Sequence, residues 1–262
     1  MIYWAQLLHF YQPPTQLPEV LEKICDESYR PLIDVFCQYP SARATVNING
    51  VLTEMLWYHG HKDIVEELAE LAQRGQIELT GSGKYHPILP LIPVKEMERQ
   101  IRLNRITNSH FLGKTQKSLG FLPPEMAYSP EIVQPVIESG HRWIIVSGVA
   151  CPTEWPVNKI HYIEHDKGRL MVFFRDDLVS NKISFKGVSA SEFLKNLKQL
   201  KGNRESIYVV TAMDAETYGH HIEDWEKLFL AEVYDEIQPT AETFAAYRQA
   251  TALARQPVID KS

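Results

Sequence analysis

Short apolar runs alternate with helical patterns along the whole chain. The apolar runs predict strands at Ile2–Leu8, Ala44–Ile48, Ile77–Thr80, Ser118–Leu122, Trp143–Val146, Leu170–Phe174 and Ile207–Met213. A further run, His161–Ile163, is separated from Leu170–Phe174 by Asp166-Lys167-Gly168 and predicts a hairpin. Helical spacing of apolar residues predicts helices over Glu19–Phe36, Asp63–Arg74, Lys95–Phe111, Pro130–Ser139, Ser189–Leu200, Trp225–Ile237 and Thr240–Ala254.

This order of elements predicts an α/β fold. About seven strands, leaving out one arm of the hairpin, are joined by crossovers that mostly contain a helix, which is typical of a parallel sheet. A dinucleotide-binding fold would carry a glycine-rich turn after its first strand, but here the first strand leads into His9-Phe10-Tyr11-Gln12-Pro13-Pro14. We therefore predict a closed or nearly closed α/β barrel that forms one domain over residues 1–262.

Composition narrows the class of partner. The 262 residues include 27 Lys and Arg against 33 Asp and Glu, a formal net charge of −6, and no basic cluster is long enough to follow a phosphate backbone. No apolar stretch approaches the length of about 18 residues that spans a bilayer, and the N-terminus lacks the features of a signal peptide. The three cysteines, an odd number at no metal-like spacing, indicate a reducing compartment. We expect a cytoplasmic protein that binds neither nucleic acid nor membrane.

Polar side chains follow most of the predicted strands. In parallel α/β barrels the chemistry lies at the carboxyl ends of the strands, so these side chains are expected to converge on one face. They are His9 and Gln12, Asn47 and Asn49, Glu78 with Lys84-Tyr85-His86, Glu125, Arg175-Asp176-Asp177, and Asp214 to His221.

Two carboxylates stand out in this set. Glu125 follows two prolines that fix the local backbone, and Asp214 follows the apolar run Val209–Met213. A pair of acids across a barrel mouth is the minimal apparatus for glycoside cleavage, since one attacks and the other gives a proton. An acid at a strand end also commonly caps the next helix or pairs with an arginine. The aromatic residues that could stack on sugar faces are Tyr11, Tyr85, Tyr128, Trp155 and Tyr218.

Four motifs in order resemble glycoside hydrolase family 57. They are Gln12-Pro13, Glu78 with Tyr85-His86-Pro87, Leu122-Pro123-Pro124-Glu125, and Asp214-Ala215-Glu216. The resemblance implies a distorted, TIM-like (β/α)7 barrel with extra C-terminal helices, here residues 222–262. It also implies a retaining mechanism on α-linked glucans or oligosaccharides, as in amylases, 4-α-glucanotransferases and branching enzymes.

The same resemblance assigns roles by position. Glu125 matches the nucleophile and Asp214 the general acid/base. We expect an oligo- or polysaccharide substrate and neither cofactor nor metal. The expected substrate-binding residues, which include two of the aromatic residues and one histidine after the last strand, are His9, Gln12, Glu78, His86, Tyr128, Arg175, Tyr218 and His220.

The chain also departs from the family pattern. Tyr11 stands where the family usually has a histidine, and Phe121 stands where it usually has a tryptophan. In the family both positions contact substrate, so the resemblance implies an altered specificity. The chain resembles a short member without most of the C-terminal helical domain. The barrel flank that this leaves exposed predicts self-association into a homo-oligomer.

Two alternatives remain open from the sequence. The first is a metal-dependent deacetylase or mannosidase-like enzyme on a related barrel, whose ligands would come from His9, Asp214, His220 and His221, although the Asp-Asp pair expected after the first strand is absent. The second is a catalytically weak or inactive barrel that binds carbohydrate.

Overall fold

The computed structural model describes residues 1–113, 118–152 and 160–237. Its strands are β1 (Ile2–Phe10), β2 (Ala44–Ile48), β3 (Ile77–Thr80), β4 (Gly120–Phe121), β5 (Trp143–Val146), β6 (His161–His165), β7 (Gly168–Phe174) and β8 (Ile207–Asp214). Its α-helices are α1 (Pro18–Ile24), α2 (Arg30–Gln38), α3 (Gly50–Tyr58), α4 (Lys62–Gln73), α5 (Val94–Phe111), α6 (Val133–Glu138), α7 (Asp177–Ser184), α8 (Ala190–Lys201) and α9 (Glu232–Glu236).

Shorter helical turns connect these elements. Two are π-helical, η1 (Cys25–Tyr29) between α1 and α2, and η7 (Glu226–Ala231) before α9. The 3₁₀ turns are η2 (Leu89–Leu91), η3 (Pro124–Met126), η4 (Pro130–Ile132), η5 (Gly148–Ala150) and η6 (Ala215–Thr217).

The strands form two four-stranded sheets. Their orders are β3-β2-β1-β8 and β4-β5-β7-β6. All ladders are parallel except that between β6 and β7, where Ile163 lies opposite Leu170. The predicted hairpin is therefore confirmed, and so is the predicted α/β fold with parallel strands.

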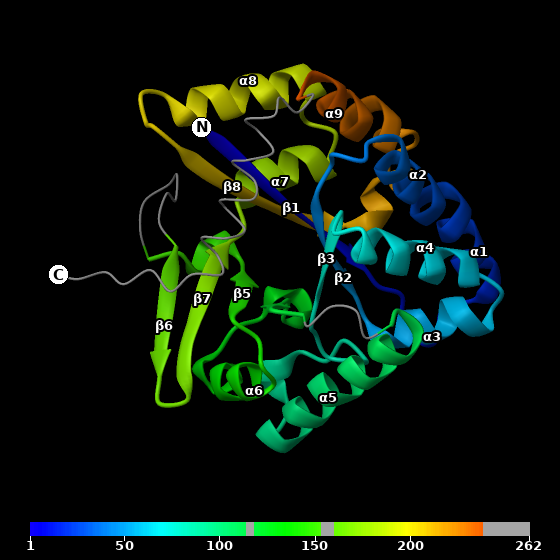
Figure 1. Ribbon diagram of the computed structural model, residues 1–262, viewed down its shortest axis with the longest axis vertical. Helices are drawn as coiled ribbons and strands as arrows, with labels where there is room; N and C mark the ends of the chain where they lie inside the picture. Colours follow the sequence, from blue (N-terminus) through cyan, green and yellow to red (C-terminus); the bar gives the residue numbers. More distant parts are fainter. Residues whose placement is uncertain (114–117, 153–159, 238–262) are drawn as a thin grey trace.

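Two seams bring the sheets together. At the first, Gly81 forms a parallel bridge with Phe121, and the Gly81 amide donates to the Gly120 carbonyl at 2.8 Å. At the second, the Asp176 amide after β7 donates to the Val210 carbonyl of β8 at 2.7 Å. Seven parallel strands thus follow one another in the order β8-β1-β2-β3-β4-β5-β7, with helices around them (Figure 1). Since the ladders stop at both seams in the described residues, the ring is a distorted barrel.

Alternation along the strands separates an inner from an outer face. Val210 and Ala212 of β8 pack with three other buried side chains inside the ring, Leu7, Leu122 and Ile145. Leu8 and Met213 point the other way and join the larger core beneath the helices. Because successive side chains on a strand alternate, Asp214 shares the inner face with Ala212.

The hydrophobic pattern missed α3 and α7. Helix α3 contacts both α4 and α5, so it buries Val51, Leu52 and Leu56 and lacks a clear polar stripe. Helix α7 has only eight residues and begins where the Asp176 carboxylate accepts the Val179 amide at 2.9 Å. The helix predicted over Thr240–Ala254 lies outside the described residues. The single domain over residues 1–262 and the extension over 222–262 stay predictions.

Two other predicted elements are shorter in the structure. The strand predicted over Ser118–Leu122 is reduced to β4, because the prolines that follow cannot donate to a ladder. The helix predicted over Pro130–Ser139 begins as the 3₁₀ turn η4 before α6. No helix in the described ranges combines the length and the apolar character needed to cross a bilayer.

The seam at Gly81 has no room for a side chain. A Cβ there would lie 2.1 Å from Nε2 of the buried His141. We expect Gly81→Ala to lower the free energy of unfolding by about 1–3 kcal/mol, because overpacking forces neighbours out of place. Urea unfolding followed by circular dichroism measures this change. Gly187→Ala is the control, since its Cβ would meet its nearest neighbour at an ordinary 3.5 Å. Equal stability of the two variants would contradict the tight seam.

Candidate active site

The carboxyl ends of four neighbouring strands carry one row of polar side chains. In the ladder registers His9 on β1 lies opposite Asp214 on β8 and opposite Asn47 on β2. Asn47 in turn lies opposite Thr80 on β3. The row therefore runs across the inner face at one level of the barrel, as expected for parallel strands that end together.

Hydrogen bonds fix the protonation pattern of this row. His9 Nδ1–H donates to Asn47 Oδ1 at 2.8 Å, and the Asn47 amide donates to Thr80 Oγ1 at 2.8 Å. His9 Nε2 therefore accepts, and His86 Nε2–H donates to it at 3.1 Å. Burial lowers the pKa of both histidines to about 4, with a smaller opposing effect of the Asn47 hydrogen bond on His9. The site thus holds two neutral imidazoles at pH 7.

The loop that carries His86 is anchored from outside the barrel. The Lys84 ammonium is buried and lies 2.7 Å from Glu54 Oε1 of α3. The Tyr85 amide donates to Gln100 Oε1 of α5 at 3.1 Å. These two contacts hold His86 in the left-handed region at φ 55°, a conformation that non-glycine residues seldom adopt.

Glu125 stands on a strained turn directly after two prolines. Its backbone is left-handed, with φ 57° and ψ 17°, and Met126 follows with φ 52°. Its side chain is 68% exposed, and its Oε1 lies 3.8 Å from His86 Nε2. Among the described residues other than glycine, five have a positive φ, and three of them are His86, Glu125 and Met126. Such strain concentrates at functional sites, where surrounding structure maintains it.

Asp214 ends β8 on the inner face, with a side chain that reaches solvent. Partial burial raises its pKa above the ordinary value, while the positive charges that His221, His86 and Arg175 can carry oppose that shift. The negative charges of Glu125 and Asp214 both act on the pKa of His86 in the upward direction, against the larger effect of burial. Both carboxylates therefore lie within electrostatic range of one imidazole.

Arg175 lies at the seam between β7 and β8. Its Nε donates to the Ala212 carbonyl at 2.8 Å, and its Nη1 lies 2.6 Å from Asp177 Oδ1. Its Nη2 donates to Asn181 Oδ1 at 3.0 Å. The guanidinium is thus held by the start of α7, and its positive charge acts to lower the pKa of Asp214.

Three of the predicted substrate-binding residues point away from this row. Gln12 is buried and donates through Nε2 to Glu216 Oε1 at 2.9 Å. His220 pairs through Nδ1 with Glu27 Oε2 at 2.7 Å. The Tyr218 side chain is fully buried and its hydroxyl bonds Met213 Sδ at 3.3 Å, and its role toward substrate stays a prediction. The 3₁₀ turn η6 directs the chain after Asp214 into the core, which local periodicity does not reveal.

Glu78 and Tyr128 lie at the margins of the site. Glu78 is half-buried and precedes Thr80 by two residues on β3, so it shares the inner face one layer deeper in the barrel. Tyr128 follows Glu125 by three residues and is 38% exposed. Burial and, to a smaller degree, Glu131 raise its pKa. Their roles toward substrate stay predictions.

The expected substrate-binding residues did not include Tyr11, Asn47 or His221, which the sequence placed only in the wider set of candidates. The Tyr11 ring stacks on His86, with ring centroids 4.1 Å apart and an interplanar angle of 18°. Burial and, second, the charge of Glu125 raise the pKa of the Tyr11 hydroxyl, so Tyr11 lies within electrostatic range of Glu125. Tyr11 follows His9 by two residues, so strand alternation was a usable signal. His221, rather than its neighbour His220, acts electrostatically on Asp214.

The ligands of the metal-dependent alternative do not gather in one place. His9 and Asp214 are ladder neighbours, whereas His220 bonds Glu27 of η1. Within the described ranges, no group of three or more His, Cys, Asp or Glu side chains is arranged to hold a metal ion.

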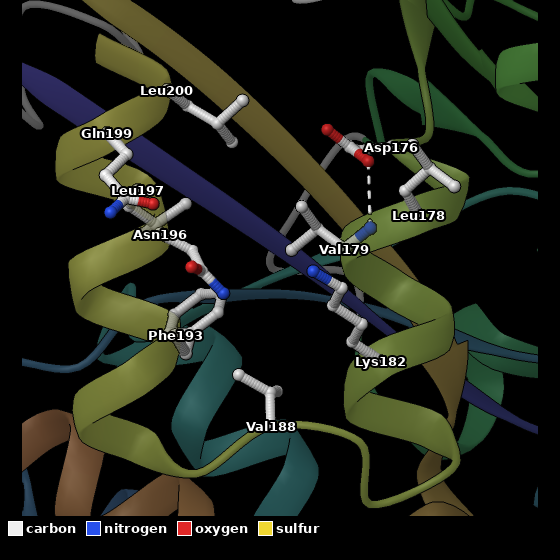
Figure 2. A pocket seen from close by; sticks show the side chains of 10 residues that line it. All are labelled: Asp176, Leu178, Val179, Lys182, Val188, Phe193, Asn196, Leu197, Gln199 and Leu200. Carbon is white, nitrogen blue, oxygen red and sulfur yellow. Dashed lines mark hydrogen bonds between the residues drawn. The ribbon is translucent and has the colours of Figure 1, made fainter. Parts of the chain in front are cut away.

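A separate groove of 380 Å³ lies between the outer helices α7 and α8 (Figure 2). Its walls are mainly apolar, and it contains none of the side chains of the row at the strand ends. The side chains that line it are Asp176, Leu178, Val179, Lys182, Val188, Phe193, Asn196, Leu197, Gln199 and Leu200. The site described above and this groove are therefore distinct features.

The paired histidines can be tested without substrate. We expect both imidazoles to stay neutral from neutral pH down to about pH 5, with His9 protonated on Nδ1 and His86 on Nε2. Nitrogen-15 NMR of the imidazoles measures this, with His9→Gln and His86→Gln to assign the signals. Below a pH of about 6.5 the unfolded chain binds protons on both histidines that the folded chain does not bind. The free energy of unfolding therefore decreases as the pH falls from about 6.5 toward 4. Protonation of either ring near its ordinary pKa would contradict this geometry.

Comparisons with known proteins place this arrangement in a family. The model of glycosyl hydrolase family 57 matches residues 5–258. Alpha-amylase 1 of Dictyoglomus thermophilum is 35% identical over 147 residues, which cover 55% of this chain and 21% of the relative. The 4-alpha-glucanotransferase of Thermococcus litoralis is 27% identical over 243 residues, which cover 88% of this chain and 35% of the relative.

The solved structure of the Thermococcus litoralis 4-alpha-glucanotransferase is similar in fold. It superposes with a TM-score of 0.81 at 24% identity and covers 95% of this chain and 40% of that one. This similarity supports the predicted barrel. The chain spans about a third or less of the length of these relatives. From the family match over nearly its whole length, this chain belongs to glycosyl hydrolase family 57.

Proposed function

We propose that the chain is the catalytic barrel of a retaining glycoside hydrolase or transglycosidase that acts on α-linked glucans or oligosaccharides. The observation that carries the proposal is the convergence of Glu125 and Asp214 on His86. Glu125 Oε1 lies 3.8 Å from the imidazole, and the charge of Asp214, at the end of β8, acts on the same imidazole. The names of the relatives, an amylase and a glucanotransferase, support the substrate class.

The surroundings of the two acids support different roles. Asp214 has a raised pKa because it is partly withdrawn from water, which favours the protonated form that a general acid needs. Glu125 is 68% exposed on its strained turn and is accessible to attack a bound sugar. We therefore assign Glu125 as nucleophile and Asp214 as acid/base.

The reaction would proceed in two displacements. The Glu125 carboxylate attacks the anomeric carbon while Asp214 gives its proton to the departing glycosidic oxygen. Asp214, now ionised, takes a proton from water or from a sugar hydroxyl, whose oxygen releases the glycosyl group from Glu125. Because His9 and His86 stay neutral, they place no positive charge beside the developing oxocarbenium ion. The half-buried Tyr11 ring, stacked on His86, offers an aromatic surface to the sugar.

Removal of either carboxylate tests the proposal. We expect Glu125→Gln and Asp214→Asn each to lower kcat on α-linked oligosaccharides by at least about 100-fold. Chromatography of the products measures the rate. Glu131→Gln and Asp224→Asn are matched controls, because they remove an exposed acid with the same change of atoms. Near wild-type turnover in either of the first two variants would overturn the assignment. Binding without cleavage or transfer by the wild type would favour the alternative of a carbohydrate-binding barrel.

A substrate with a good leaving group separates the two roles. Fluoride departs from an α-glycosyl fluoride with little need for a proton, so Asp214→Asn should release it in the first turnover at close to the wild-type rate. Glu125→Gln should not, because attack itself is lost. Proton NMR of the first sugar product should show the α-anomer before mutarotation, as retention requires. An initial β-anomer would argue for inversion.

We also propose a cytoplasmic setting. Cys25, Cys37 and Cys151 are free thiols in the structure, which is typical of a reducing compartment. Protein taken from cells without reductant, then unfolded and alkylated at once so that the buried Cys25 also reacts, should carry three modified thiols, and a disulfide between any two would contradict the proposal.

A further inference from the structure

The segment of residues 214–221 is contacted by the π-helical turn η1, and Glu226 of the π-helical turn η7 lies beside Gly219. Turn η1 interrupts an otherwise continuous helix between α1 and α2, and turn η7 precedes α9. A π-turn inserts one extra residue into a helix and is frequent at functional sites. Here the extra residue in η1 changes which side chains of the helix face the segment.

Turn η1 presents two fully buried side chains to this segment. Ser28 Oγ donates to the Ala215 carbonyl at 2.9 Å. The Tyr29 hydroxyl donates to Glu216 Oε1, the oxygen that also accepts from Gln12 Nε2. Both residues after Asp214 are therefore tied to the same turn, one through its backbone and one through its side chain.

The backbones also approach closely at this point. Gly219 has φ +102°, and a Cβ there would lie only 1.7 Å from the Glu27 carbonyl oxygen of η1. Only glycine allows this contact, so the backbones of the segment and of η1 meet at Gly219. Tyr218 closes the other side by packing into the core with its hydroxyl on Met213 Sδ.

Burial of the Glu216 carboxylate costs free energy. It is 5% exposed, and burial raises its pKa to about 7, while the hydrogen bonds from Tyr29 and Gln12 oppose that shift and the charge of Asp214 adds to it. A buried carboxylate is tolerated only where donors compensate for lost water. Nothing in the packing of apolar residues requires an acid here, so its hydrogen bonds explain its presence.

We propose that Tyr29 is a positioning residue, which holds Glu216 from the π-turn and thereby fixes the place of Asp214 two residues earlier. This inference rests on the proposed function, since it takes Asp214 as the acid/base. The Tyr29 hydroxyl touches neither substrate nor reacting atoms. Its effect is to keep the backbone after β8 from shifting, and shifts of about 1 Å in a catalytic group can cost about 100-fold in rate.

The test uses the leaving-group dependence of the first turnover. Tyr29→Phe removes only the hydroxyl and keeps the ring in the core. We expect release of an unactivated α-linked sugar to slow by about 10- to 100-fold, with KM nearly unchanged. Release of fluoride from an α-glycosyl fluoride should slow less than about twofold, because that step needs no positioned acid. A merely structural defect would slow both substrates alike and would overturn the proposal.

Two further variants complete the comparison. Tyr39→Phe removes the hydroxyl of a tyrosine at the other end of α2 and should spare both substrates. Glu216→Gln keeps an oxygen that can accept from Tyr29, so it should slow the unactivated substrate less than Tyr29→Phe does. A loss in Glu216→Gln as large as in Tyr29→Phe would overturn the positioning role, since charge rather than position would then matter.

Hydrogen exchange separates this inference from the proposed function. In Tyr29→Phe the amides of residues 214–221 should exchange about tenfold faster than in the wild type, because a local restraint on opening is lost. In Tyr39→Phe they should exchange at the wild-type rate. This readout needs no substrate: an inactive wild type would overturn the proposed function, whereas unchanged exchange in Tyr29→Phe would overturn the positioning role.

Discussion

The structure of the site depends on the register of β1 between its two parallel partners. That register places His9 opposite Asn47 on one side and opposite Asp214 on the other. A slip of one residue would turn His9 to the outer face and would bring Phe10 inside, because side chains alternate along a strand. The large outer core, which contains Leu8 and Phe10, therefore also fixes the position of the polar row.

Next to this row, the site contains two residues whose backbone conformations are strained. His86 and Glu125 occupy the left-handed region, and each such residue costs about 1–3 kcal/mol. The surrounding structure supports them unequally. His86 is held by the Lys84–Glu54 ion pair behind its loop, whereas Glu125 is held by the two prolines before it. The rigid scaffold thus maintains a geometry that the loops alone would not adopt, as expected where groups must be preorganised.

Sequence reasoning predicted the strands and placed Glu125 and Asp214 at strand ends, because these features depend on local patterns. Apolar runs mark strands wherever they lie in the chain, and a parallel sheet brings their carboxyl ends together. The directions of Gln12 and Tyr218 could not be predicted in this way. They depend on contacts between segments about two hundred residues apart, such as Gln12 with Glu216 and Gly219 with Glu27, which no local pattern records. Tyr11 was accessible to alternation along β1, yet its contact with His86 depends on a loop from another part of the chain.

The surroundings of the two acids differ because their backbones occupy different elements of the fold. Asp214 is the last residue of a buried strand, so its neighbours on β1 and the turn after it withdraw it from water and raise its pKa. Glu125 lies beyond a strand of two residues, on a turn that lifts its side chain into solvent. The proposed mechanism needs a proton on Asp214 and an accessible carboxylate at Glu125. Both acids lie near the same imidazole. Their different surroundings follow from the lengths of β8 and β4 and from the turns after these strands.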